Sequence, residues 1–206
     1  MLYLNDHIQD FDFEAALPLL SEQRREYALK FRHLSGRRTC AAAYLLLCEG
    51  LRREYGIDEL PVFGYGEHGK PFIIGHPDIH FNLSHCREAA ICVLSDRPVG
   101  VDIESSRSVT DGLLRYTMND DEQREIAASP RPDLAFLRFW TMKEAVLKCT
   151  GEGLNNDLKT ALDGVATVPG SQGISGIASL TTVVAPDERY VYSVCHAAVE
   201  TADTRA

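Results

Sequence analysis

Acidic side chains on one short stretch of this sequence have the spacing and chemistry to bind a metal ion. The stretch VGVDIE at 99–104 alternates apolar residues with others, which is the pattern of a β-strand with one apolar face. Asp102 and Glu104 then share the opposite face, where neighbouring carboxylates repel each other. A divalent cation would cancel that repulsion, and hard oxygen ligands suit Mg²⁺. We also expect Gly100, on the same face, to leave room for a ligand.

A second stretch, FWTMKEAVLK at 139–148, supplies a further carboxylate and a cation. Trp140, Glu144 and Lys148 recur every four residues, so a helix would align them in one stripe. Taken alone, Glu144 and Lys148 are also the pattern of a surface ion pair on an amphipathic helix. Combined with the acidic strand, they complete a set of three carboxylates and one lysine.

A third stretch, GKPFIIGHPDIHFNLSHCREA at 69–89, carries groups that bind phosphate. Lys70 lies between glycine and proline in a turn, which favours a fixed point charge. Ser84 and His85 end a probable strand. His85 alone is most simply a structural histidine, but beside Lys70 and a metal site it becomes a candidate phosphate donor.

The elements that must position these residues form a mixed α+β pattern. Helices predicted near 21–55 and 111–150 each precede or follow short strands, which suggests a loose internal duplication. Ser21 and Ser35 are candidate N-caps, and Gly56 is a candidate helix stop. Asn119 with Glu122 resembles a capping box. Strands are predicted at 2–5, 62–65, 70–74, 80–84, 89–95 and 99–104, and in hairpins after 164.

Composition narrows the class of protein. The chain has 206 residues, a net charge of −9 and six cysteines without a C-x-x-C pair, so neither nucleic-acid binding nor a zinc site is expected. Its N-terminus is acidic, unlike a secretory signal, and no apolar run is long enough to span a membrane; we expect a cytoplasmic protein. The basic stretch 21–40 fits a small polyanion, or simply a solvated helix face.

In this order and spacing, GKP, FNLSHC, VGVDIE and FWTMKEAVLK…GEGL resemble the 4′-phosphopantetheinyl transferases. The resemblance is to the larger, monomeric type that activates carrier proteins such as those of surfactin synthetase, and it covers about 21–154. It implies an α+β fold of two similar halves, 1–96 and 97–206, related by a pseudo-twofold axis. The active site would lie in the cleft between the halves.

The resemblance also implies roles for particular residues. Mg²⁺ would be held by Asp102, Glu104 and Glu144, with Glu144 also our candidate base. Lys148 would contact the phosphates and protonate the leaving group. Coenzyme A would be contacted by Arg38 at its 3′-phosphate, and by Lys70, Pro71, Ser84 and His85. A further glutamate near the site would be Glu122.

The activity so implied is transfer of 4′-phosphopantetheine from coenzyme A to a serine of an apo acyl or peptidyl carrier protein, releasing adenosine 3′,5′-bisphosphate. We expect the carrier to dock by local basic and apolar surface near 115–118. Two alternatives use the same residues: a Mg²⁺-dependent phosphohydrolase acting on coenzyme A or a nucleotide, and a non-catalytic module that binds carrier proteins.

Overall fold

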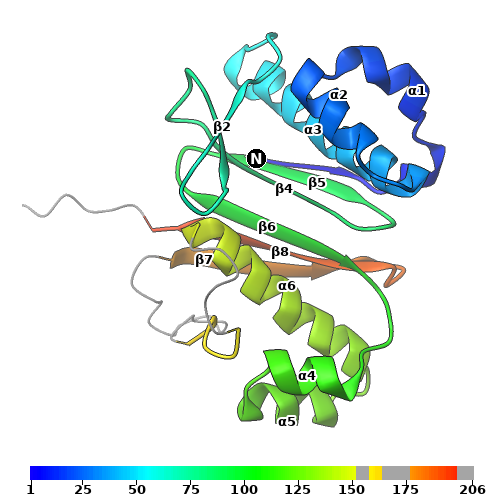
Figure 1. The fold of residues 1–206 in the computed structure, drawn as a ribbon. Coiled ribbons are helices and arrows are strands. Elements are labelled where there is room, and N and C mark those ends of the chain that lie inside the picture. Colours follow the sequence, from blue (N-terminus) through cyan, green and yellow to red (C-terminus); the bar gives the residue numbers. More distant parts are fainter. Residues whose placement is uncertain (152–157, 164–176, 199–206) are drawn as a thin grey trace, which may run out of the picture.

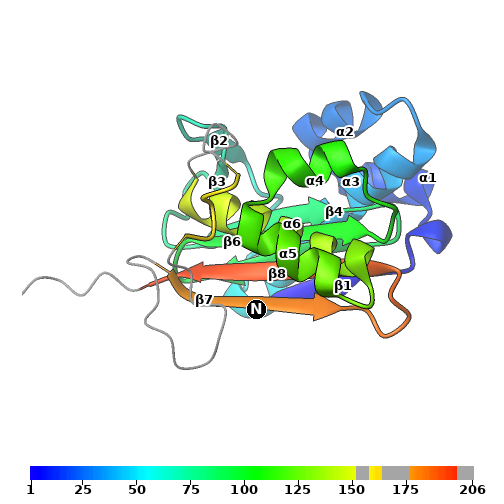
Figure 2. The same ribbon diagram turned by 90° about the horizontal axis from the view of Figure 1, so that it is seen from below.

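A computed structural model describes residues 1–151, 158–163 and 177–198. Two antiparallel sheets lie next to each other, and each is covered by helices on its outer side (Figure 1). The view from below shows the helices of the C-terminal half lying across the strands they cover (Figure 2). The expected α+β class is confirmed, while the pseudo-twofold axis and the division at 96/97 stay predictions.

The N-terminal sheet has the strand order β1-β5-β4. Its strands are β1 (Leu2–Asn5), β4 (His80–His85) and β5 (Ala90–Ser95). Of these, β5 carries a continuous apolar run and is buried on both faces. One face packs on the long helix α3 (Leu34–Tyr55), through Phe81, Cys92 and Leu94. The flanking elements are α1 (Phe13–Ala16), α2 (Glu22–Leu29), 3₁₀ turns at Ile8–Asp10 and Leu17–Leu19, and a hairpin of β2 (Phe63–Tyr65) and β3 (Pro71–Ile73).

Helix ends follow the sequence signals, with one exception. The Ser21 hydroxyl accepts a hydrogen bond from the Arg24 amide and caps α2, and Gly56 ends α3 at a φ of 68°. A left-handed φ of this kind is a conformation that glycine adopts without strain. The prediction of Ser35 as an N-cap is wrong, because α3 begins at Leu34 and its N-cap His33 makes no side-chain cap.

The C-terminal sheet has the order β6-β8-β7. Its strands are β6 (Val99–Ser105), β7 (Ile177–Val184) and β8 (Tyr190–Ala197). Three helices follow β6 along the chain, namely α4 (Asp111–Thr117), α5 (Asp120–Ala128) and α6 (Pro132–Thr150). The capping box of Asn119 and Glu122 is formed at the start of α5. The strands predicted within 164–176 lie outside the described residues.

The two halves meet where β4 and β6 lie side by side. Apolar side chains of β6 pack on those of β5, in a cluster that includes Val101, Ile103, Ile91 and Val93. This apolar junction fixes the sheets against each other, so the polar ends of β4 and the acidic face of β6 face one region. Among the described helices, none combines the length and the hydropathy that a membrane crossing requires.

Candidate active site

The acidic face of β6 is covered by helix α6. A Cβ atom on Gly100 would lie 2.0 Å from the carbonyl oxygen of Ala145 and 2.4 Å from the amide nitrogen of Cys149. No side chain fits at such distances from a helix backbone, so Gly100 permits a close approach of α6. The expectation that Gly100 leaves room for a ligand is wrong: the space holds the helix that carries Glu144 and Lys148.

Asp102 is the centre of a buried hydrogen-bonded cluster. Its Oδ1 atom lies 2.6 Å from Lys148 Nζ and accepts a hydrogen bond of 3.0 Å from the Ser84 hydroxyl. Lys148 also donates to Ser84 Oγ at 3.3 Å. The other carboxylate oxygen, Asp102 Oδ2, is buried and has no hydrogen-bond partner. Three separated motifs therefore meet at one carboxylate, one of whose oxygens has no hydrogen-bond partner.

Glu104 lies two residues further along the same strand face. The Trp140 indole donates to Glu104 Oε1 at 3.2 Å, and Arg107 lies 3.8 Å from its other oxygen. Burial, followed by the negative charge of Asp102, raises the pKa of Glu104. The stripe predicted on the helix is confirmed here, since Trp140 and Lys148 both reach β6 from α6.

Glu144 lies between those two residues on α6 and is half-buried. Within the described residues it forms no hydrogen bond, and the alternative ion pair with Lys148 does not occur, because Lys148 bonds to Asp102 instead. Burial and then the charge of Asp102 raise the pKa of Glu144, and Glu104 adds to the effect. The three carboxylates therefore lie close enough to repel one another.

His85 ends β4 at the rim of the same region. Its ring is exposed and lies edge-on to Phe31, with 6.3 Å between the ring centres. Partial removal from water, then the positive charges of Lys148 and Arg24, lower the pKa of His85. The two cations that oppose protonation of this imidazole, Lys148 and Arg24, are also groups that attract phosphate.

A cavity of about 340 Å³ opens beside the cluster. It is lined from α2, the β2–β3 turn, β4 and α6, by residues including Arg24, Lys70, Pro71, Asn82, Glu144 and Lys148. The Lys70 ammonium donates to the carbonyls of Val99 at 3.2 Å and Cys149 at 2.9 Å, so it caps the end of α6 at the cavity wall.

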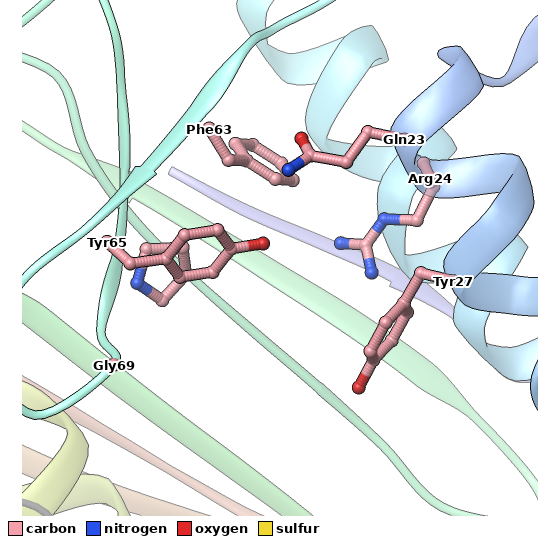
Figure 3. A pocket seen from close by; sticks show the side chains of 7 residues that line it. Gln23, Arg24, Tyr27, Phe63, Tyr65 and Gly69 are labelled. Carbon is pink, nitrogen blue, oxygen red and sulfur yellow. The ribbon is translucent and has the colours of Figure 1, made fainter.

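A second cavity, of about 240 Å³, lies next to the first and shares Arg24, Gly69 and Pro71 with it. Figure 3 shows the Arg24 side chain extending into it between Tyr27, Phe63 and Tyr65. The guanidinium carbon lies 5.4 Å from the ring centre of Tyr27 and 5.4 Å from that of Phe63. From the sequence, Arg24 was indicated by the basic composition of 21–40 and by a loose alignment of this region with the family.

One basic and one acidic residue suggested by the resemblance lie away from these cavities. Arg38 donates to the carbonyl of Gln9 at 3.2 Å and lines neither of these cavities. Glu122 is buried and pairs with the fully buried Lys143, whose Nζ lies 2.7 Å from Glu122 Oε2. Glu122 thus fastens α5 to α6 and is paired away from the carboxylates that face the cavity.

The carboxylates have the right chemistry for a hard cation, but they do not surround one point. In the parts of the chain that the structure describes, no three His, Cys, Asp or Glu side chains are gathered as a metal site. Lys148 provides the positive charge beside Asp102 instead. The open Asp102 Oδ2 and the unbonded Glu144 are the two observations that fit a metal ion.

Comparison with known proteins shows which family this chain resembles. The family model for the 4′-phosphopantetheinyl transferase superfamily matches residues 98–195, which span β6 to β8. The 4′-phosphopantetheinyl transferase psf-1 of Bacillus pumilus is 30% identical over 80% of this chain and 74% of its own length. The 4′-phosphopantetheinyl transferase Sfp of Bacillus subtilis is 27% identical over 75% of this chain and 70% of its own.

A solved structure gives a more distant alignment. The holo-[acyl-carrier-protein] synthase of Thermotoga maritima aligns with 48% of this chain and 62% of that chain, at 18% identity and a TM-score of 0.37. The matched relatives and the cluster around Asp102 together lead to one conclusion: the chain belongs to the 4′-phosphopantetheinyl transferase superfamily.

Proposed function

We propose that this chain transfers 4′-phosphopantetheine from coenzyme A to a serine of an apo acyl or peptidyl carrier protein in the cavity between its halves, with Mg²⁺. Phosphopantetheinyl transfer is the activity of its family. The observation that carries the proposal is the cluster of Asp102, Ser84 and Lys148, which lies beside Glu104 and Glu144 and next to a cavity lined by Lys70 and Pro71.

Asp102, Glu104 and Glu144 are the residues that would hold Mg²⁺. Asp102 Oδ2 has no partner in the protein, and Glu144 has none among the described residues. Mg²⁺ is usually bound by a few carboxylates together with water and substrate phosphates, so a wholly protein-made cage is not required. When bound, the ion would neutralise charge on the pyrophosphate of coenzyme A.

The chain's own residues would do the rest of the chemistry. The carrier serine oxygen forms a bond to the β-phosphorus of coenzyme A, and the bond from that phosphorus to the bridging oxygen breaks. Glu144 would accept the serine proton, because its raised pKa makes it a better base than an ordinary carboxylate. Lys148 would donate a proton to the departing phosphate of adenosine 3′,5′-bisphosphate, and His85 would donate a hydrogen bond to the pyrophosphate.

Coenzyme A would extend from this cluster along the two adjoining cavities. Lys70 and Pro71 line the first, and Arg24, which lines both, is the cation best placed for a phosphate or for stacking against a base. Arg38, from the same basic region, stays a second candidate for the 3′-phosphate. Ser84 supports this surface from beneath, because its buried hydroxyl already contacts Asp102 and Lys148.

The test is a transfer assay read by mass spectrometry. The protein is mixed with coenzyme A, Mg²⁺ and an apo carrier protein, and the carrier is examined for a phosphopantetheine adduct on serine. The proposal predicts one adduct per carrier and release of adenosine 3′,5′-bisphosphate. Breakdown of coenzyme A without an adduct would indicate a phosphohydrolase, and carrier binding without chemistry would indicate a non-catalytic module; either result overturns the proposal.

A further inference from the structure

The free edge of β6 is completed by side chains instead of a neighbouring strand. β8 pairs with one edge of β6, and backbone groups at alternate residues point away from β8, toward the N-terminal half. Four of these groups have side-chain partners. Two carbonyl oxygens accept from lysines: Val99 O from Lys70 at 3.2 Å and Val101 O from Lys148 at 3.3 Å. Two amides donate to side chains of β4: Val101 N to Asn82 Oδ1 at 2.9 Å and Ile103 N to Ser84 Oγ at 3.3 Å.

Asn82 and Ser84 form the part of this edge that comes from β4. They are two residues apart on the strand, so their side chains leave the same face, and both are buried. Each accepts from the residue 19 positions later, which means that β4 and β6 run in the same direction at one fixed register. A slip of β6 along β4 would leave two buried amides without acceptors.

This register determines where the acidic face of β6 lies. Asp102 sits between the two bonded amides, and the Ser84 hydroxyl that accepts from Ile103 N also donates to Asp102 Oδ1 at 3.0 Å. His85 follows Ser84 directly at the end of β4. The hydrogen bonds of Asn82 and Ser84 therefore fix the position of β4, which carries His85, relative to β6, which carries Asp102.

We propose that Asn82 is a positioning residue for the transfer reaction, acting through the Val101 amide to hold β6 in the register that places Asp102 beside Lys148 and near His85. The inference rests on the proposed function for the reaction that is positioned. Asn82 also lines the first cavity, so a direct contact with coenzyme A is the competing explanation. A lost contact raises KM, whereas a misplaced catalytic group lowers kcat.

The test compares Asn82→Leu, which removes the acceptor at similar size, with Asn82→Asp, which keeps an acceptor oxygen. Asn119→Ala removes the N-cap of α5 and controls for a general loss of stability. Amide hydrogen exchange is followed by NMR in the free protein. We expect Val101 to exchange about tenfold faster in Asn82→Leu than in the control at matched stability, with protection restored in Asn82→Asp.

Turnover is measured on the same variants. We expect kcat of Asn82→Leu to fall at least about tenfold while KM for coenzyme A stays within about threefold. If the wild-type enzyme is active but Val101 exchanges no faster in Asn82→Leu than in the control, this inference alone is overturned. Faster exchange with unchanged kcat, or a raised KM with unchanged kcat, also overturns it. A wild-type protein that transfers nothing overturns the proposed function and the positioning role together, even where the exchange data confirm the bonds.

Discussion

Lys148 Nζ lies 2.6 Å from Asp102 Oδ1, and this contact joins the last turn of α6 to the middle of β6. It draws Lys148 away from Glu144, its neighbour one turn earlier on the helix. The carboxylate of Glu144 is thereby left without a bonded cation, half-buried and facing two other acids. One ion pair therefore both fastens the helix to the strand and leaves the Glu144 carboxylate free of Lys148 at the cavity.

The close approach of α6 to β6 predicts a severe effect of Gly100→Ala. The added methyl group would overlap the helix backbone at Ala145 and Cys149, which cannot rotate away as a side chain can. We expect the free energy of unfolding to fall by about 3 kcal/mol or more, measured by chemical denaturation. Gly112→Ala is the matched control, because nothing lies within 4 Å of its added Cβ and the residue is exposed in a helix. Equal stability of the two variants would contradict this packing.

The buried pair of Lys143 and Glu122 predicts a large effect on stability from residues that are not among the carboxylates facing the cavity. Lys143→Met leaves the Glu122 carboxylate buried without its cation, which costs about 3–5 kcal/mol when a buried pair is broken in this way. Arg124→Met, at an exposed ion pair with Asp121 on the same helix as Glu122, should leave stability nearly unchanged. Thermal denaturation of both variants decides the point; a small loss in Lys143→Met would show that the pair does not hold α5 to α6.

Arg24 is predicted to bind coenzyme A, and its neighbour Arg25 is not. Arg24→Ala should raise KM for coenzyme A about tenfold or more with a smaller change in kcat, because a guanidinium that contacts a phosphate contributes mainly to binding. Arg25→Ala removes the same charge from an exposed site and should leave KM almost unchanged. Equal effects of the two substitutions would mean that only the general basic field of α2 matters.

The pKa of His85 is predicted to rise when coenzyme A binds. In the free protein it is lowered by partial burial and by Lys148 and Arg24, whereas a bound pyrophosphate would favour the charged imidazole. Without ligand, unfolding takes up a proton at His85, so its contribution to stability is lost as the pH falls from about 6.5 through the folded pKa. NMR titration of the imidazole with and without coenzyme A measures the change. An identical pKa in both states would separate His85 from the binding site.

Much of the local structure could be predicted from the sequence, because its signals are short-range. The caps at Ser21 and Gly56 and the alternation of 99–104 depend on neighbours a few residues apart. The stripe on 139–148 was equally readable, since helical spacing alone puts Trp140 and Lys148 on one face. Ser35 was misread because a serine near a helix start is a cap only when the backbone turns at that residue.

The tertiary choices could not be predicted in the same way. Nothing local tells whether Gly100 admits a ligand or a helix, and nothing in 139–148 tells whether Lys148 pairs with Glu144 or with Asp102. Lys143 reads as an exposed lysine until α5 is placed over it, and nothing near Glu122 in the sequence shows that its carboxylate pairs with Lys143. Each of these contacts depends on a helix or strand that is far away in the sequence.

We expect the carboxylate of Asp102 to organise phosphopantetheinyl transfer. The direct measurement is the rate of adduct formation on an apo carrier protein by Asp102→Asn, compared with the wild-type protein at saturating coenzyme A and Mg²⁺. The substitution keeps the size of the side chain and removes its charge, and circular dichroism checks that the fold is retained. We predict a loss of at least about 100-fold in the rate. A folded Asp102→Asn variant that modifies the carrier at the wild-type rate would contradict the account.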